Sequence, residues 1–68
     1  MIISARNSFK GTVKKISRGP VNTEVIIEIN PGVEVTAVIT KSSADNLRLI
    51  EGGEAIAIVK ASDVLVAV

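Results

Sequence analysis

The most constraining feature of this 68-residue sequence is an alternation of side chains that runs on both sides of one turn signal. In residues 21–29, Val, Thr or Ile recurs at every second position, and mostly polar residues stand between them. The same period of two continues through residues 33–40. Such a period places one set of side chains on each face of a β-strand. Both segments are therefore predicted to be strands, joined by a tight turn at Asn30-Pro31-Gly32.

A further strand is expected before this pair, over residues 8–17. Phe9, Gly11 and Val13 share one phase of the alternation, whereas Ile16 falls in the other. This phase slip predicts a β-bulge or a strong bend near Lys14-Lys15. A glycine inside a strand is typical of a close approach by a neighbouring backbone or of strand coiling, and we expect one of these at Gly11.

After residue 40 the alternation stops, and residues 41–47 are predicted to form a short helical turn. Ser42 or Ser43 is expected to cap it, with Asp45 in its first turn. Leu47 and Leu49 are expected to close one end of a barrel. Residues 54–60 and 64–68 are aliphatic on both faces and are predicted to be the last two strands, joined by a turn at residues 61–63.

Five strands with a short helix between the third and the fourth follow the order of an OB-like barrel. The sequence thus predicts an all-β fold, a five-stranded OB-like barrel forming one domain over residues 1–68. A chain this small has little core, and with no cysteine it has no disulfide to stabilise it. Because 47% of its residues are hydrophobic and its last strands have no polar face, we expect apolar surface to be buried between subunits.

Composition also limits the possible functions. Without Cys or His the common nucleophile arrangements and Cys/His zinc sites are missing, so no catalysis and no directly ligated metal cation is expected. No apolar run approaches the length of a membrane span, and Met1-Ile2-Ile3 is too short for a signal peptide, so a cytoplasmic protein without membrane contact is expected.

Nucleic-acid binding is an alternative that the predicted fold raises. OB barrels bind single strands through aromatic side chains beside a basic groove. Here Phe9 is the single aromatic residue and the net charge is only +1, but Lys10, Lys14 and Lys15 keep this alternative open. A third alternative is an assembly domain whose anion sites are incidental.

An anion site suits the polar residues at the strand ends better. Arg6 stands between Ser4 and Asn7, and Lys60 ends a strand two residues before Ser62. Cationic groups, hydroxyls and backbone N–H groups are the donors that an oxyanion needs. Thr40 and Ser43 offer further donors at the start of the helical turn. A competing interpretation is that these two residues cap the helix and that Arg6 pairs with Asp63 or Glu54.

Three segments in order resemble the molbindins, a family of small molybdate- and tungstate-binding proteins. They are Ser4-Ala5-Arg6-Asn7 followed by Lys10-Gly11, residues 33–40 followed by Ser43 and Leu47, and residues 57–64. The resemblance covers the whole chain. It implies an OB-like fold, a hexamer built as a trimer of dimers, and oxyanion sites between subunits that store or buffer molybdate or tungstate inside the cell, with no organic cofactor.

The resemblance also implies which residues bind. One subunit would supply Ser4, Arg6, Lys60, Ala61 and Ser62, with help from Ala5 and Asn7. A neighbouring subunit would supply Thr40 and Ser43. A second class of site on the symmetry axes maps to the loop formed by Arg18, Gly19, Pro20, Val21, Asn22 and Thr23.

Overall fold

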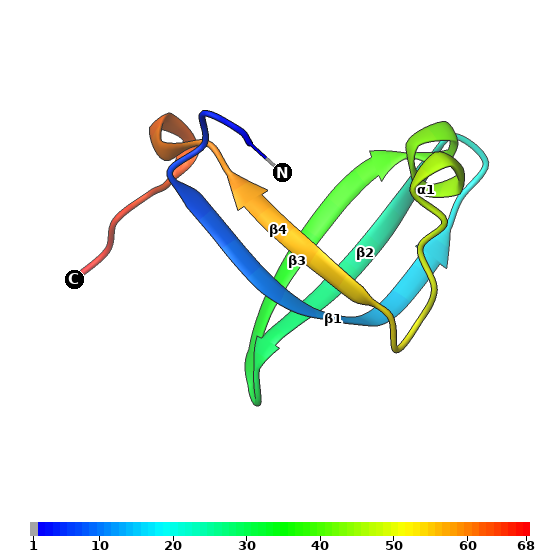
Figure 1. Cartoon of the computed structure of the whole chain (residues 1–68), viewed down its shortest axis with the longest axis horizontal. Helices are drawn as coiled ribbons and strands as arrows, with labels where there is room; N and C mark the ends of the chain where they lie inside the picture. The colour runs from blue at the N-terminus through cyan, green and yellow to red at the C-terminus, as the bar shows by residue number, and fades with distance from the viewer. Residues whose placement is uncertain (1) are drawn as a thin grey trace.

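The computed structural model describes residues 2–68 as one curled antiparallel sheet with a short helix (Figure 1). Its elements are β1 (Asn7–Arg18), β2 (Asn22–Asn30), β3 (Val33–Thr40), α1 (Lys41–Leu47), β4 (Glu54–Val59) and the 3-10 turn η1 (Ala61–Asp63). The strands pair in the order β3-β2-β1-β4. The predicted fold class, all-β and OB-like with a helix between the third and fourth strands, is confirmed.

The barrel is open, because residues 64–68 form no strand in this structure. The sheet therefore has four strands in place of the five expected, and β3 and β4 are its two edges. The aliphatic pattern of residues 64–68 is that of a strand, but a strand also requires a neighbouring edge that completes its hydrogen bonds. Residues 64–68 extend away from the sheet and have no such neighbour (Figure 1).

The predicted bulge in β1 is confirmed, since the β1–β2 register shifts between Val13 and Lys15. Backbone groups of β1 on both sides of this bulge form hydrogen bonds with the turn before β4. Val13 N donates to Gly53 O at 2.8 Å, Gly52 N donates to Val13 O at 2.8 Å, and Ile16 N donates to a carboxylate oxygen of Glu51 at 3.1 Å. The bend divides β1 between two partners: its first half pairs with β4 and its second half with β2.

The predicted close approach at Gly11 is also confirmed. A Cβ atom placed on Gly11 would lie 2.5 Å from the carbonyl oxygen of Glu28 and 2.9 Å from a side-chain carbon of Ile27. Real Cβ atoms do not approach a backbone oxygen so closely. A hydrogen atom in place of a side chain is therefore what lets β1 cross β2 at this point.

The alternating residues of β2 and the middle of β1 form the core. The core cluster consists of Val13, Val25, Ile27 and Ala57, and Ala44 of the helix is also buried. Leu49 packs against this core as expected, but Leu47 is 65% exposed and does not close the barrel end. None of the helices among residues 2–68 has the length and apolar character needed to cross a bilayer.

The helix has the predicted bounds, Lys41–Leu47, but its N-cap lies two or three residues before the predicted caps Ser42 and Ser43. Thr40, the last residue of β3, is the N-cap, and its Oγ1 accepts a hydrogen bond from Ser43 N at 3.1 Å. Ser42 and Ser43 therefore lie inside the helix, and Asp45 is not in the first turn. The extended backbone of a strand end is also the backbone that an N-cap requires, so strand and helix share this boundary without a loop.

Thr23 offers a test of core packing. Its side chain is fully buried, and its Oγ1 has no hydrogen-bond partner among residues 2–68. A buried hydroxyl without a partner costs about 1 kcal/mol or more, and valine keeps the shape while removing it. We expect Thr23→Val to raise the unfolding midpoint by about 4–8 °C in a thermal melt. A lower midpoint would mean that the hydroxyl gains a partner in solution.

Candidate functional site

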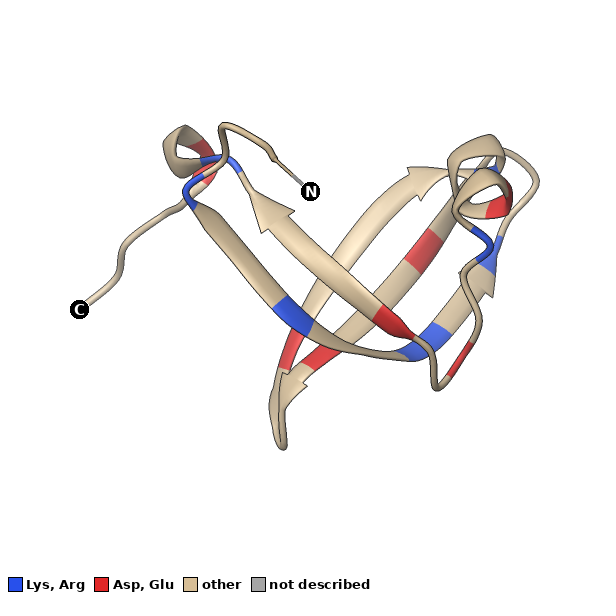
Figure 2. Cartoon of the chain, in the orientation of Figure 1, with Lys and Arg blue, Asp and Glu red and all other residues tan. Residues whose placement is uncertain are grey.

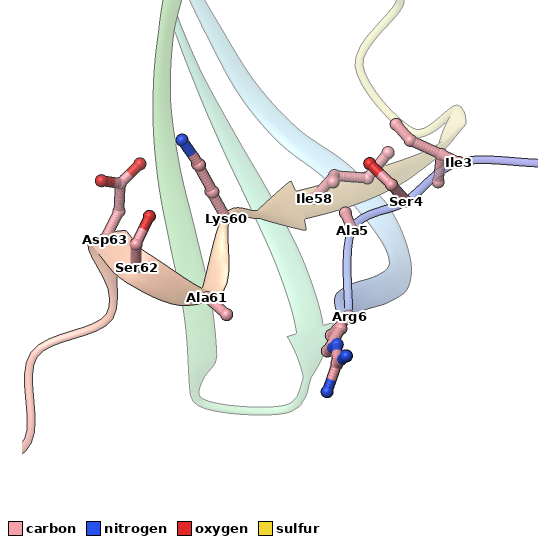
Figure 3. A pocket seen from close by; sticks show the side chains of 9 residues that line it. All are labelled: Ile3, Ser4, Ala5, Arg6, Ile58, Lys60, Ala61, Ser62 and Asp63. Carbon is pink, nitrogen blue, oxygen red and sulfur yellow. The ribbon is translucent and has the colours of Figure 1, made fainter.

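The two ends of the sequence meet where β1 begins and β4 ends. Asn7 pairs with Val59, and the Asn7 side-chain amide also donates to Val59 O at 3.2 Å. This pairing sets residues 4–6 beside the turn that follows β4. Between them lies a depression of about 580 Å³ (Figure 3), lined by Ile3, Ser4, Ala5, Arg6, Ile58, Lys60, Ala61, Ser62 and Asp63.

Most of the residues predicted to bind an oxyanion therefore lie around one depression. These are Ser4, Ala5, Arg6, Lys60, Ala61 and Ser62. Asn7 is not part of the lining; its side chain links β1 to β4 and so positions the segments on either side. The Asn7 contact spans 52 positions in the sequence, so the depression depends on a pairing between distant segments.

The two cations of this depression point in different directions. In Figure 3 the Lys60 ammonium lies on the same side as Ser62 and Asp63, whereas the Arg6 guanidinium points to the opposite side. Lys60 enters η1 with an extended backbone, and the Asp63 N–H donates to Lys60 O at 2.9 Å. This tight turn carries both Lys60 and Ser62 to the lining of the depression.

Sequence reasoning missed three lining residues, of which Asp63 matters most chemically. Asp63 adds a carboxylate to a region selected for cations and hydroxyls. Asp63 follows directly after Lys60, Ala61 and Ser62, which were predicted to bind. It was not predicted itself, because a carboxylate does not donate hydrogen bonds to an anion. Within residues 2–68, Arg6 forms no ion pair with Asp63 or Glu54, which the competing interpretation had predicted. The Glu54 carboxylate instead lies 3.5 Å from Lys10 Nζ.

Thr40 and Ser43 are not part of the depression. They lie at the start of α1, at the other end of the molecule from η1 and the N-terminal segment (Figure 1). Besides the capping bond, Thr40 Oγ1 donates to Ser43 Oγ at 2.9 Å. The capping interpretation of these residues is therefore confirmed. One copy of the chain does not bring the two predicted groups of donors together.

The loop predicted to form a second site is held by bonds within the chain. Gly19 N donates to Asn22 O at 2.9 Å, and Lys41 N donates to Val21 O at 2.9 Å. The Arg18 guanidinium lies 3.4 Å from a carboxylate oxygen of Asp45. Thr23 is buried and Val21 is 70% exposed. None of residues 18–23 lines the depression of Figure 3, so this loop lies apart from it.

The lysines of β1 do not form a continuous basic groove. Lys10 pairs with Glu54 and Lys14 with Glu34, and Figure 2 shows acidic and basic positions interspersed along the strands. The hydrogen bond with Glu34 and the charge of that carboxylate raise the pKa of the exposed Lys14 ammonium. These neutralised pairs leave little field to attract a phosphate backbone.

Comparisons with known proteins agree with the architecture. The model of the TOBE domain family matches residues 3–66. Molybdenum-pterin-binding protein 2 of Clostridium pasteurianum is 42% identical over 66 residues, which cover 97% of each protein. The structure of MopII from the same organism superimposes with a TM-score of 0.92 and is 40% identical, covering 98% of this chain and 100% of that one.

A third relative carries a more specific description. The structure of ModG, described as a cytoplasmic molybdate-binding protein and solved with molybdate bound, is 51% identical with a TM-score of 0.83. The match covers 90% of this chain and 43% of ModG. ModG is described as binding molybdate, molybdenum-pterin-binding protein 2 is named for a molybdenum-pterin, and none of the three descriptions mentions a nucleic acid. On these matches, the chain belongs to the TOBE domain family and is a member of the molbindins that its sequence resembles.

Proposed function

We propose that this protein binds molybdate, and tungstate by the same chemistry, without catalysing a reaction. The observation that carries the proposal is the depression in which the Arg6 segment and the Lys60–Ser62 turn meet, in a chain related to molybdate-binding proteins. Cationic groups, hydroxyls and free backbone N–H groups at a strand end and a 3-10 turn supply the donors that a tetrahedral oxyanion requires.

The site is proposed to be completed by a second copy. An oxyanion that loses its water needs replacement donors for every oxygen atom. One copy offers Lys60 and Ser62 on one side of the depression, while Arg6 points away from them. Thr40 and Ser43 lie at the other end of the molecule, so they can join only from a neighbouring copy. This division supports sites between subunits, and the family resemblance makes a hexamer our specific proposal.

Selectivity is proposed to follow from the donor character of the site. Molybdate near neutral pH carries oxygens that only accept hydrogen bonds, whereas a protonated phosphate also carries a donor. A donor that faces donors is left unpaired, which disfavours phosphate. Sulfate is an acceptor like molybdate but smaller, so its discrimination depends on the size of the cavity.

The cellular role that we propose is storage or homeostasis of the oxyanion in the cytoplasm, by a single domain over residues 1–68. No organic cofactor is required by this proposal, although a relative's name mentions a molybdenum-pterin. The loop of residues 18–23 is kept as a second, independent proposal for binding on the symmetry axes.

Native mass spectrometry in a volatile buffer without sulfate tests the proposal most directly. We expect an oligomer, a hexamer in our proposal, that gains several molybdate masses when molybdate is added and loses few of them when sulfate is in excess. Equal displacement by sulfate would contradict the selectivity. A monomer that gains no molybdate would contradict both the interface sites and the function.

The nucleic-acid alternative is tested on the same protein. A labelled single-stranded oligonucleotide should show no salt-dependent retention, because Lys10 and Lys14 are paired with carboxylates and Phe9 is the single aromatic residue available for stacking. Retention that falls steeply with salt would revive this alternative.

A further inference from the structure

The depression formed by the Arg6 segment and η1 contains one group that a site for anions does not need. Of the nine described residues that line it, Arg6 and Lys60 are cationic and Asp63 alone is acidic. Asp63 is exposed, and within residues 2–68 its carboxylate accepts no hydrogen bond and forms no ion pair. Its position is therefore not explained by a contact that it makes within this part of the chain.

The geometry of η1 brings the Asp63 side chain to Lys60. Asp63 N donates to Lys60 O at 2.9 Å, which is the hydrogen bond between residues three apart that is typical of a 3-10 turn. Side chains three residues apart in such a turn lie over one another. In Figure 3 the Asp63 carboxylate and the Lys60 ammonium accordingly point to the same side, away from the Arg6 guanidinium. The flexible lysine side chain can turn its ammonium toward the carboxylate.

The formal charges on this side of the depression cancel, since Lys60 is positive and Asp63 is negative. Molybdate is a dianion near neutral pH, so this side has no net charge to attract it. In the part of the chain that the structure describes, Lys60 forms no ion pair with any other residue. An ammonium that a second copy covers without a counter-charge is costly. Asp63 is placed to supply that counter-charge when no oxyanion is bound.

We propose that Asp63 is an internal competitor of the oxyanion. Its carboxylate pairs with the Lys60 ammonium in the empty site and releases it when molybdate binds. This inference rests on the proposed molybdate site and identifies a residue that tunes it. Because binding exchanges one partner of Lys60 for another, only the difference between the two pairings adds to the affinity. The exchange lowers the affinity and so favours release of the oxyanion.

Neutral variants of Asp63 test this competition. Asp63→Ala removes the charge without adding a donor, and Asp63→Asn keeps the shape. Isothermal titration of each full chain with molybdate, in sulfate-free buffer of low ionic strength, should show both variants binding about 5- to 10-fold more tightly than the parent. Asp63→Glu keeps the carboxylate and should stay within about twofold of the parent. Unchanged or weaker binding in both neutral variants would overturn the proposal. A gain with asparagine alone would also overturn it, since the amide would then act as a new donor.

The matched control is Glu54→Gln, which removes one negative charge at the start of β4, outside the depression. The Glu54 side chain is 68% exposed and pairs with Lys10. Its affinity for molybdate should stay within about twofold of the parent, because a distant exposed charge is screened by solvent and salt. A gain in this control equal to that of Asp63→Asn would assign the effect to net charge and overturn the proposal.

A Lys60→Ala background separates competition from direct repulsion. Repulsion between Asp63 and molybdate does not require Lys60, whereas competition for the ammonium does. Asp63→Ala should therefore strengthen binding by less than about twofold when it is combined with Lys60→Ala. An equal gain in both backgrounds would overturn the competition.

The parent chain separates failure of this inference from failure of the proposed function. If the parent binds molybdate and the neutral Asp63 variants match it, only the inference fails. If the parent is folded by circular dichroism and binds no molybdate, the proposed function fails and the inference fails with it.

Discussion

Replacing Arg6 or Lys60 with alanine is expected to weaken molybdate binding by about 10- to 150-fold. The expectation follows from about 1.5–3 kcal/mol for a hydrogen bond that involves a charged group. Both residues line the depression, and each substitution removes one of its two charged donors, which leaves a desolvated oxyanion oxygen without that partner. Isothermal titration with molybdate in sulfate-free buffer measures the change for each variant.

The control for both variants is Lys15→Ala, which removes a positive charge outside the depression. It separates the loss of a specific donor from a general change in electrostatic attraction, and it should leave the affinity nearly unchanged. Sedimentation of every variant should match the parent chain, so that a loss of assembly is not mistaken for a loss of binding. Parent-like affinity in both the Arg6 and the Lys60 variants would disprove the site assignment.

Gly11→Ala is expected to lower the stability of the fold by about 3 kcal/mol, near the upper range for overpacked positions. The new Cβ would lie 2.5 Å from the Glu28 carbonyl oxygen, which is backbone and cannot rotate away. The β1–β2 crossing must separate to admit it. For a domain of this size the unfolding midpoint should fall by about 12–24 °C.

The matched control is Gly32→Asn in the turn between β2 and β3. Gly32 has a positive φ of 80°, but nothing lies within 4 Å of a Cβ placed there, and asparagine tolerates that conformation. Thermal melts should therefore show a much smaller loss for Gly32→Asn than for Gly11→Ala. If Gly11→Ala melts with the parent chain, the close approach at Gly11 does not exist in solution.

Local patterns predicted much of the fold because they report directly on backbone geometry. The alternation in residues 21–29 and 33–40 requires two strands, and the phase slip at Lys14-Lys15 requires a bulge. The N-cap was predicted at Ser42 or Ser43 and lies at Thr40, two or three residues earlier. The sequence pattern fits Thr40 equally well as the last residue of a strand. Strand and cap need the same backbone angles there, and the pattern alone does not separate them.

Features that depend on contacts with other segments of the structure were harder to predict from the sequence. Residues 64–68 have a strand pattern, but a pattern carries no information on whether an edge is present beside them. The residues near Arg6 and Lys60 were predicted from their donor groups and from the resemblance to the molbindins, and the structure brings most of them to one depression. The opposite directions of their side chains depend on η1, a turn whose geometry the letters Ala-Ser-Asp do not specify.

The pairing of Asn7 with Val59 has a consequence for how the chain folds. The β2–β3 hairpin joins neighbouring segments, whereas the Asn7–Val59 contact closes a loop spanning 52 positions. Closing a long loop costs more entropy than closing a short one. The half of β1 that pairs with β4 should therefore form its hydrogen bonds last on folding and lose them first on unfolding. The depression is made from those late-closing ends. An oxyanion bound in the depression would stabilise the β1–β4 pairing, the least stable part of the sheet. Ligand binding and folding would therefore stabilise each other.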